Sequence, residues 1–512
     1  MGEIGGFLRI HRVGFDKRDP SERVRDYKQY FHTQPDSELR EQGGRCMDCG
    51  VPFCHEGCPL GNLIPDWNDA VYRGEWRQAI DIAHETNNFP EFTGLICPAP
   101  CESACVLDIN DDPVTIEQIE LAIAERAWAS GWIVPSPPRR RTGRSVGVVG
   151  SGPAGLAVAD ELNQMGHAVT VYERDEGVGG LMRFGVPDAK LEKWIIDRRA
   201  DLLADEGVQF RTGVDVGRDV RPEELRERHD ALVVAIGSRV HRDLEVPGRG
   251  LEGVHFAMDY LYQRNRAVAR MEGRPAPDPA APISAAGKHV IVVGGGDTGM
   301  DCMSNSLREG ARDVRMLDVY PELPESGRHE STPWPLAPKR TPSTYALEEG
   351  GERQWNAEVV EVRGAGRVER VLARRVEGTS SRDLRPVPGS EFELPADLVL
   401  IAIGFSHPEH AGPVDELGLE KDARGNVKAP VYATSVDGVF ACGDARIGQS
   451  LVVTAIAEGR KCARMVDRHL GGPEELPPPE DPDAHFIEHA AETAGTVTMS
   501  HQLPGEGSAA PG

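Results

Sequence analysis

The chain of 512 residues lacks three features that would each place it in a particular class of protein. It has no uninterrupted apolar run approaching about 18 residues, which argues against a membrane-spanning helix. Its first residues, MGEIGGFLRIHRVGF, contain neither a long apolar core nor a small-residue cleavage site, so we expect no signal peptide. Position 6 is Gly6 instead of Ser or Thr, which disfavours N-myristoylation.

Positive charge is also scarce. The chain has 57 Lys and Arg against 82 Asp and Glu, a formal net charge of −25. Nucleic acids and anionic membranes bind clustered basic side chains, so we expect neither as a partner. Without an export signal we expect a cytoplasmic protein. In that reducing compartment, clustered cysteines more often hold metal than form disulfides.

Cysteine, by contrast, is concentrated: seven of the ten cysteines lie in the first fifth of the chain. The stretch RCMDCGVPFCHEGCP (45–59) has the spacing C-x2-C-x4-C-x3-C-P, and ICPAPCESAC (96–105) has C-x3-C-x3-C. Seven thiolates suit zinc poorly, because each ion takes four ligands and His55 would have to complete a second site. The pattern is closer to iron–sulfur proteins, in which a cysteine followed by proline ligates the second of two clusters. Zinc and free structural thiols stay open as alternatives.

Two units of strand, glycine turn, helix and strand follow, each preceded by a Pro-rich linker. The first has G-x-G-x-x-G at 150–155 and ends its next strand with Glu173; the second repeats the pattern at 294–299 with Asp318. The glycines allow a tight turn, close approach of a pyrophosphate and close helix packing, and the acid accepts from a ribose hydroxyl. Two copies in the required context predict two dinucleotide sites.

A third motif, CGDARIGQSLVV, lies near the end of the chain and contains Gly443 and Asp444. It resembles the second flavin motif of flavoproteins with two dinucleotide domains. In those proteins the first glycine turn holds FAD and the second holds NAD(P)H. No C-x-x-C follows either turn, which argues against a thioredoxin-reductase-like disulfide shuttle.

The choice of nicotinamide coenzyme stays open. A carboxylate at Asp318 accepts from a free 2′-hydroxyl and repels a 2′-phosphate, which favours NADH. Arg328, Lys339 and Arg340 follow in the next loop, within reach of a phosphate. These three basic residues are also consistent with a solvated surface.

Several segments together carry a resemblance to a known family: RCMDCGVPFCHEGCPLGNLIPDWN, TNNFPEFTGLICPAPCESAC, PVTIEQIE, GVVGSGPAGLAVADELNQMGHAVTVYE, GLMRFGVPDAKLEK and CGDARIGQSLVV. They closely resemble the small (beta) subunits of bacterial glutamate synthase, from about residue 5 to 470. The N-terminal half of dihydropyrimidine dehydrogenase is a relative. The resemblance implies FAD, two 4Fe–4S clusters and NADPH or NADH as cofactors. It also implies a hetero-oligomer with the large (alpha) subunit, and no catalytic residue, because the cofactors carry the chemistry.

The resemblance also assigns site residues. One cluster would be held by Cys46, Cys49, Cys54 and Cys105. The other would be held by Cys58, Cys97 and Cys101, with Glu120 as eighth ligand and Glu117 and Gln118 as its competitors. The expected FAD residues are Gly150, Gly152, Pro153, Ala154, Gly155, Glu173, Gly180, Leu181, Gly443, Asp444, Gln449, Ser450 and Leu451. The expected NAD(P)H residues are Gly294, Gly295, Gly296, Asp297, Thr298, Gly299, Asp318 and Arg328.

The expected fold is α/β, with two Rossmann-like domains in a glutathione-reductase-like arrangement behind a mainly α-helical iron–sulfur domain. We expect the iron–sulfur domain at 1–140, the FAD domain at 141–286 and 428–475, the NAD(P)H domain at 287–427 and a disordered tail at 476–512. A helix is predicted over 113–130, where apolar residues recur at three- and four-residue steps. LVVAIG and LVLIAIG, ending at Gly237 and Gly404, are expected as buried strands and as crossovers between the domains.

The activity that the resemblance implies is oxidation of NAD(P)H through FAD, with single electrons passed through the clusters to the large subunit. That subunit makes L-glutamate from L-glutamine and 2-oxoglutarate. Three alternatives share the same motifs. They are a ferredoxin-reducing or sulfide-linked electron-bifurcating subunit, a non-catalytic scaffold subunit and a zinc-stabilised flavin reductase.

Overall fold

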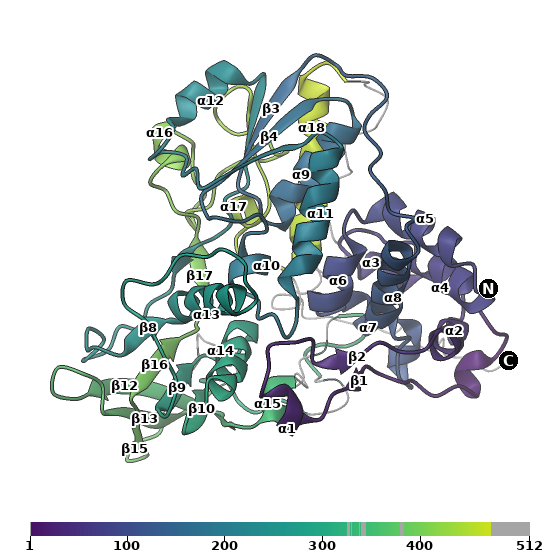
Figure 1. The fold of residues 1–512 in the computed structure, drawn as a ribbon. Coiled ribbons are helices and arrows are strands. Elements are labelled where there is room, and N and C mark those ends of the chain that lie inside the picture. Colours follow the sequence, from purple (N-terminus) through teal and green to yellow (C-terminus); the bar gives the residue numbers. More distant parts are fainter. Residues whose placement is uncertain are drawn as a thin grey trace, which may run out of the picture.

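The computed structural model describes residues 2–324, 328, 330–336, 338, 345–378 and 383–472. In Figure 1 a group of short helices lies beside two units that each contain a sheet flanked by helices. The expected tail at 476–512 lies outside the described residues, as do Lys339 and Arg340. Within the described ranges, no helix is both long enough and apolar enough to cross a bilayer.

The N-terminal part is mainly helical, in agreement with the prediction. It comprises α1 (Pro20–Arg23), α2 (Asp36–Gly44), α3 (Phe53–Glu56), α4 (Ile64–Arg73), α5 (Trp76–Thr86), α6 (Pro90–Ile96), α7 (Pro100–Ser103) and α8 (Ile116–Ala129), with the short strands β1 (Asp16–Lys17) and β2 (Phe31–His32). The apolar faces of these helices meet in a core that includes Trp67, Ile80 and Ile119. The helix predicted at 113–130 is α8, which begins three residues after Pro113.

The first sheet is parallel throughout, with the strand order β18-β6-β3-β4-β5. Its elements are β3 (Ser145–Val149), α9 (Pro153–Gln164), β4 (Ala168–Glu173), α10 (Leu181–Phe184), α11 (Lys193–Asp205), β5 (Gln209–Thr212), α12 (Pro222–Arg228), β6 (Ala231–Val234), β18 (Val439–Ala441), α17 (Asp444–Ile447) and α18 (Val452–His469). Strands β3 and β6 are almost wholly buried and rich in Val, as expected for a parallel sheet covered by helices on both faces.

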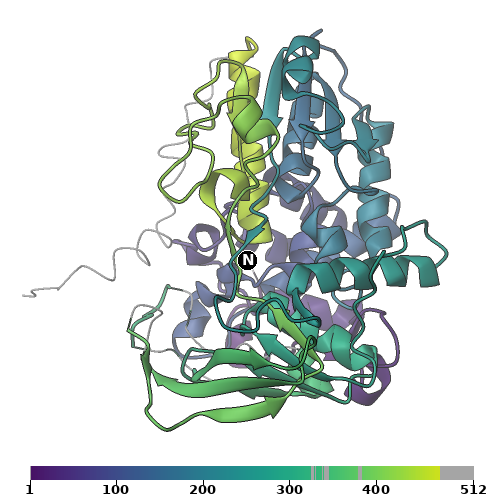
Figure 2. The ribbon, with the colours of Figure 1, turned by 90° about the vertical axis from the view of Figure 1, so that its left-hand side faces the viewer.

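The second sheet repeats this design, with the order β11-β10-β9-β16-β8. Its elements are β8 (Val254–Phe256), α13 (Ala257–Met271), β9 (His289–Val293), α14 (Asp297–Arg308), β10 (Asp313–Leu317), α15 (Tyr345–Glu349), β11 (Glu352–Gln354) and β16 (Leu398–Ile401). An antiparallel layer of β12 (Ala357–Arg363), β13 (Arg370–Glu377), β14 (Arg385–Pro386) and β15 (Phe392–Pro395) packs on it, at the bottom of Figure 2. The expected α/β class with two dinucleotide-type units is therefore present.

The two units are joined by a pair of short antiparallel strands, β7 (Val240–His241) and β17 (Phe405–His407). The two segments expected as buried strands and as crossovers form β6 and β16, which are buried interior strands of the two sheets, and the chain crosses immediately after each of them. Consequently β8 and α13 belong to the second sheet, although the expected boundary at 286 assigns them to the FAD domain. The Pro-rich segment before Lys288 lies inside the second unit. The remaining domain boundaries stay predictions.

A buried ion pair joins the N-terminal helices to the first unit. Arg199 on α11 donates from Nε and Nη2 to the two carboxylate oxygens of Glu91 on α6, at 2.6 and 2.9 Å. The exposed fractions of the two side chains are 4% and 0%. Burial alone would raise the pKa of Glu91, but the charge and hydrogen bonds of Arg199, with a smaller contribution from Arg198, together outweigh it and hold that pKa below its usual value. This pair fixes how α6, and the Cys97 that follows it, lies against the first sheet.

We expect Arg199→Met to lower the free energy of unfolding by about 3–5 kcal/mol, because it leaves the Glu91 carboxylate buried without its partner. Glu91→Leu combined with Arg199→Met should recover most of this loss, which a double-mutant cycle in urea measures. Since the pKa of Glu91 is depressed in the folded state, the wild-type contribution is present above about pH 4.5 and is lost as the pH falls below that value. Equal stability of wild type and Arg199→Met at pH 7 would contradict this account.

Candidate functional site

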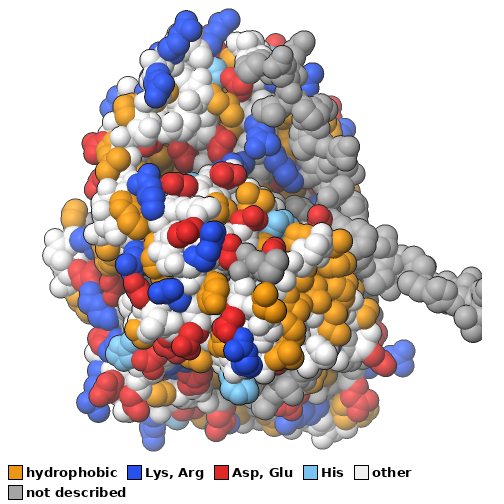
Figure 3. Space-filling view, turned by 90° about the vertical axis from the view of Figure 1, so that its right-hand side faces the viewer, with side chains coloured by type: hydrophobic (Ala, Val, Ile, Leu, Met, Phe, Trp, Pro, Cys, Tyr) orange, Lys and Arg blue, Asp and Glu red, His pale blue; other side chains and the backbone are white. Residues whose placement is uncertain are grey.

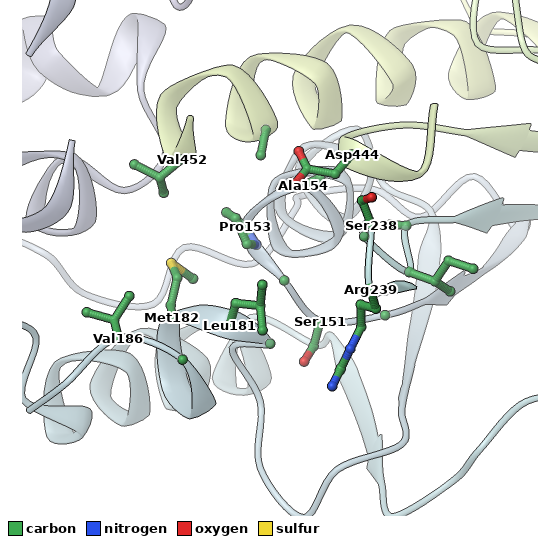
Figure 4. A pocket seen from close by; sticks show the side chains of 18 of the residues that line it. Ser151, Pro153, Ala154, Leu181, Met182, Val186, Ser238, Arg239, Asp444 and Val452 are labelled. Atoms are coloured by element: carbon green, nitrogen blue, oxygen red, sulfur yellow. The ribbon is translucent and has the colours of Figure 1, made fainter. Parts of the chain in front are cut away.

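One large cavity of about 500 Å³ lies where the three parts of the chain meet. The first glycine turn, both crossover regions, α17 and α10 line it, together with residues of the N-terminal helices and of α14. Figure 4 shows Val186, Met182 and Val452 toward one side of this cavity, and Ser238 and Arg239 toward the other. Its volume is in the range of sites that enclose cofactors.

The glycine turn at one wall has the geometry that a pyrophosphate needs. Gly150 has φ +103°, and a Cβ there would lie 2.4 Å from the carbonyl oxygen of Ala235. A Cβ at Gly152 would meet nothing within 4 Å, so the backbone at that position is open to a ligand. Gly152 is also the N-cap of α9, where no side chain caps the helix amides. Those free amides and the helix dipole favour an anion.

Two carboxylates flank this turn. Glu173, at the end of β4, is buried and accepts from the amide and hydroxyl of Ser151 and from the amide of Asp175. Asp444, at the start of α17, accepts from the Ser450 hydroxyl at 2.6 Å. Burial raises the pKa of Asp444 to about 6, against the hydrogen bonds from Ser450. Both acids line the cavity and offer oxygens to ligand hydroxyl groups.

The far end of the cavity is built by all three parts of the chain. Tyr30, Cys97 and Glu117 come from the N-terminal part, and Lys190 comes from the loop after α10. The Lys190 ammonium pairs with Asp301 on α14 at 2.8 Å. Burial lowers the pKa of Lys190, but the charges of its neighbours, Asp301 foremost, and the hydrogen bond to Asp301 together raise that pKa above its usual value, so the lysine stays protonated. The segment FGVPDAKLEK thus lies against the cavity through Gly185, Val186 and Lys190.

The second glycine turn is built like the first. Gly294 has φ +113°, and a Cβ there would lie 2.3 Å from the carbonyl oxygen of Ala402. Gly296, the N-cap of α14, has open space around its missing Cβ. Asp297 and Thr298, in the first turn of α14, also line the main cavity. The second turn therefore opens toward the same space as the first.

The first cysteine group surrounds a small cavity of its own. Cys46, Cys49, Cys54 and Cys105 all line it, as the resemblance implies for one cluster. Burial raises the pKa of Cys46 to about 11 and raises that of Cys54 still further. Thiolates in such surroundings need a bound cation, because a buried negative charge is costly without one.

All three members of the second group, Cys58, Cys97 and Cys101, are buried. Burial raises the pKa of Cys101 well above its ordinary value, and Cys58 and Cys97 raise it further. Glu120 is close enough to act on all three thiols. Its carboxylate accepts from Asn62 and Asn87 at 3.1 and 3.0 Å, and burial raises its pKa to about 7.

Neither cysteine group is arranged around a single ion. Among the described residues, no three His, Cys, Asp or Glu side chains converge as the ligands of one metal ion would. Zinc requires such convergence, with sulfur about 2.3 Å from the ion. A four-iron cluster takes one thiolate at each of several separate irons, so its ligands surround a larger volume. The four cysteines around a common cavity fit that requirement.

Most predicted FAD residues come together, but some predicted residues lie elsewhere. Gly155 and Gly443 pack behind the cavity, and the Gln449 side chain accepts from the amide of Phe405 at 2.8 Å instead of lining the cavity. Arg328 pairs with Asp108 and donates to the carbonyl of Ser103, so it contacts the N-terminal part. Its predicted contact with the coenzyme stays a prediction.

Sequence reasoning did not select several residues that line the cavity. Ser238 and Arg239 follow the buried strand β6. Their position at the carboxyl end of a parallel strand, where α/β sheets bind ligands, was an available signal. Tyr30 reaches the cavity only through tertiary packing, and no local motif identifies it. Glu117 was considered only as a cluster ligand, and Lys190 lies within the segment GLMRFGVPDAKLEK without having been selected itself.

An apolar face lies on the side of the molecule formed by the N-terminal part, where Figure 3 shows hydrophobic side chains gathered. The N-terminal part exposes Ile4, Leu8, Val51 and Ile109, with exposed fractions of 86, 76, 66 and 56%. Val51 lies between Cys49 and Cys54, and Ile109 follows Cys105 by four residues. Exposed apolar side chains therefore lie close in sequence to the first cysteine group.

Comparison with known families agrees with this division of the chain. Residues 144–459 match the pyridine nucleotide-disulphide oxidoreductase family, and residues 23–132 match domain II of dihydropyrimidine dehydrogenase, a 4Fe-4S cluster domain. FprA from Mycobacterium tuberculosis, solved in complex with NADPH, has the same fold with a TM-score of 0.50 and 21% identity, over 64% of this chain and 84% of FprA. The chain thus consists of an N-terminal 4Fe–4S domain followed by a pyridine-nucleotide oxidoreductase unit of the kind that uses FAD and NAD(P)H.

Full-length relatives define the family more narrowly. The small chain of glutamate synthase [NADPH] from M. tuberculosis is 50% identical over 94% of this chain and 99% of its own length. That from Bacillus subtilis is 42% identical over 93% and 100%. Glutamate synthase [NADH] of Schizosaccharomyces pombe is 43% identical over 93% of this chain, which spans 23% of that protein. This chain belongs to the family of glutamate synthase small chains.

The geometry of the two turns predicts separable defects. Gly150→Ala should reduce the FAD content of the purified protein to about a tenth or less, because the added methyl meets the Ala235 carbonyl. Gly294→Ala should retain FAD, but its 450-nm absorbance should no longer bleach with NADPH. Gly213→Ala is the control, since Gly213 has φ +69° with nothing within 4 Å of the added atom. Normal FAD content in Gly150→Ala would contradict the assignment of the first turn.

Proposed function

We propose that this chain is the electron-input subunit of a glutamate synthase, oxidising NADPH and delivering electrons to a large chain that forms L-glutamate. The observation that carries the proposal is a single cavity whose walls include the Gly150 turn, Asp297 of the second turn and Cys97 of the second cysteine group. Bound there, FAD would accept a hydride and release single electrons, and the clusters would carry electrons one at a time. The protein supplies position, enclosure and charge.

In this proposal the residues around the first turn hold FAD. The open backbone at Gly152 and the amides at the start of α9 receive the pyrophosphate, and Glu173 accepts from the adenosine ribose. Asp444 would accept from hydroxyl groups of the ribityl chain. Lys190, held by Asp301, brings a positive charge to the cavity wall, which would favour a negatively charged reduced flavin.

The second turn, Gly294–Gly299, binds the nicotinamide coenzyme. Its open side and the uncapped start of α14 suit a pyrophosphate for the same reasons as the first turn. Asp297 and Thr298 border the shared cavity, which supports direct access of a bound nicotinamide to the flavin space. The two cofactors would supply the hydride chemistry themselves, so none of the residues at this turn needs to transfer a proton.

We assign two 4Fe–4S clusters to the two cysteine groups. Cys46, Cys49, Cys54 and Cys105 hold the first, and Cys58, Cys97 and Cys101 hold the second, with Glu120 as its eighth ligand. The charge of Glu120 acts on all three thiols, which supports this choice; burial does not separate it from Gln118, because both side chains are buried. Glu117 is the remaining competitor, since its carboxylate also acts on Cys97 and lines the main cavity.

The partner in this proposal is the large chain of glutamate synthase, docked on the apolar surface formed by Ile4, Leu8, Val51 and Ile109. Exposed apolar side chains of this size indicate an interaction surface when they gather on one face. Cys49, Cys54 and Cys105 are only partly buried, whereas the second cysteine group is buried. The first group therefore lies nearer to solvent, as an exit toward a partner requires.

Substitution of one cysteine from each group tests the number of clusters. Cys105→Ala and Cys101→Ala should each lose about half of the iron and acid-labile sulfide, while both keep FAD that NADPH reduces. The electron paramagnetic resonance signals that disappear should differ between the two variants. Cys302→Ala, in the core of the second unit, should keep both signals. If both variants lose all iron, the seven cysteines serve one site.

Reconstitution tests the function itself. Co-expressed with the glutamate synthase large chain from the same source, this chain should co-purify and produce glutamate from NADPH, glutamine and 2-oxoglutarate. Alone, it should reduce ferricyanide with NADPH but form no glutamate. Failure to bind the large chain, together with reduction of ferredoxin or polysulfide, would instead indicate a related electron-transfer subunit. An NADPH-inert flavin would indicate a scaffold.

A further inference from the structure

The acid at the second glycine turn is paired with an arginine. Asp318, directly after β10, accepts from Nη2 of Arg353 on β11 at 2.6 Å. The exposed fractions of these side chains are 7% and 8%. A Cβ on Gly295 would lie 1.9 Å from Asp318 Oδ2 and 2.5 Å from Arg353 Nη2, so both groups lie directly against the turn.

The guanidinium of Arg353 has donors that the described protein does not use. Within the described residues, Nε and Nη1 are buried and have no hydrogen-bond partner. The group also stacks on the ring of Trp355, with Cζ 3.5 Å from the ring centroid, which holds it in one plane. Buried unpaired N–H groups are costly, and a planar guanidinium suits a phosphate. These unused donors beside the glycine turn suit an anionic group.

The first turn differs at the equivalent position. Glu173 accepts from Ser151 and from the Asp175 amide, which are neutral donors. A carboxylate in such surroundings accepts from a ribose hydroxyl and repels a 2′-phosphate. At the second turn the Arg353 charge compensates Asp318, so the reason that an acid at this position favours NADH no longer applies.

We propose that Arg353 binds the 2′-phosphate of NADPH and determines the coenzyme specificity of the second site; this rests on the proposed function of the Gly294 turn. Nε and Nη1 donate to the phosphate while Nη2 keeps its bond to Asp318. Sequence motifs for NADPH binding expect such an arginine near the end of the second strand, here at Asp318. Arg353 lies 35 residues further along the chain. It reaches the turn because β11 pairs in parallel with β10, with Leu317 opposite Gln354.

The test is steady-state ferricyanide reduction by the full chain loaded with FAD. Arg353→Gln should lower kcat/KM for NADPH roughly 10- to 100-fold, mainly through KM, and change kcat/KM for NADH by less than about threefold. Arg353→Lys keeps the positive charge but not the planar guanidinium, so its kcat/KM for NADPH should fall less than that of Arg353→Gln. Arg315→Gln, on the neighbouring strand β10, is the matched control and should leave both coenzymes unchanged.

Two further measurements do not depend on the folding of Arg353→Gln. On the wild type, 2′,5′-ADP should compete with NADPH at least about tenfold more tightly than 5′-ADP. Asp318→Asn should weaken the binding of NADH more than that of NADPH. The substitution removes the carboxylate that would accept from the ribose 2′-hydroxyl, but it leaves the Arg353 guanidinium in place.

Several outcomes would overturn the inference. If Arg353→Gln lowers kcat/KM equally for NADPH and NADH, Arg353 has only a structural role. If kcat/KM for NADPH is unchanged, Arg353 does not contribute to coenzyme binding. Equal competition by 2′,5′-ADP and 5′-ADP would likewise exclude a 2′-phosphate site. A wild type whose flavin is reduced by neither coenzyme would overturn the proposed function, and the inference with it.

Discussion

The docking of the N-terminal helices on the first sheet is the constraint on which the rest of the structure depends. The buried pair of Glu91 and Arg199 fixes α6 against α11, and α6 ends at Cys97. That contact brings a cysteine of the second group into the wall of the cavity that also contains the Gly150 turn. A protein controls electron transfer chiefly by how it positions its cofactors, so this interface has a direct functional consequence.

The chain contains the same glycine turn twice, and the two turns differ in the residues that surround them. Both turns begin with a glycine in the left-handed region whose Cβ would strike a carbonyl of the adjacent strand, and both open at the second glycine. Around the first copy, Asp444 and the N-terminal helices close a deep cavity. Around the second, Arg353 and Asp318 form a charged pair at the edge of the sheet. The turn defines a pyrophosphate site, and tertiary contacts define which nucleotide it suits.

What could be predicted from the sequence follows the same division. The glycine turns, the cysteine groups and the α8 helix are local patterns, and the elements they predict are present. The crossover was misassigned because the Pro-rich segment before Lys288 looks like a linker, whereas the true crossing strands β7 and β17 contain only two and three residues. Tyr30 and Arg353 reach their sites through packing between distant segments, and Gln449 is turned away by its bond to Phe405. Such contacts have no signature in a single sequence.

The gradient of burial across the two cysteine groups gives the proposed path a direction. Cys97 borders the main cavity and the second group is buried, whereas three members of the first group are partly exposed. A scaffold that used clusters only for stability would have no need to bring one group against the cavity proposed for FAD. The exposed apolar residues Val51 and Ile109 accompany the outer group and not the inner one. The main cavity, the second cysteine group, the first cysteine group and the exposed apolar residues therefore follow one another from the interior to the surface, which is the order that the proposed transfer of electrons to a partner requires.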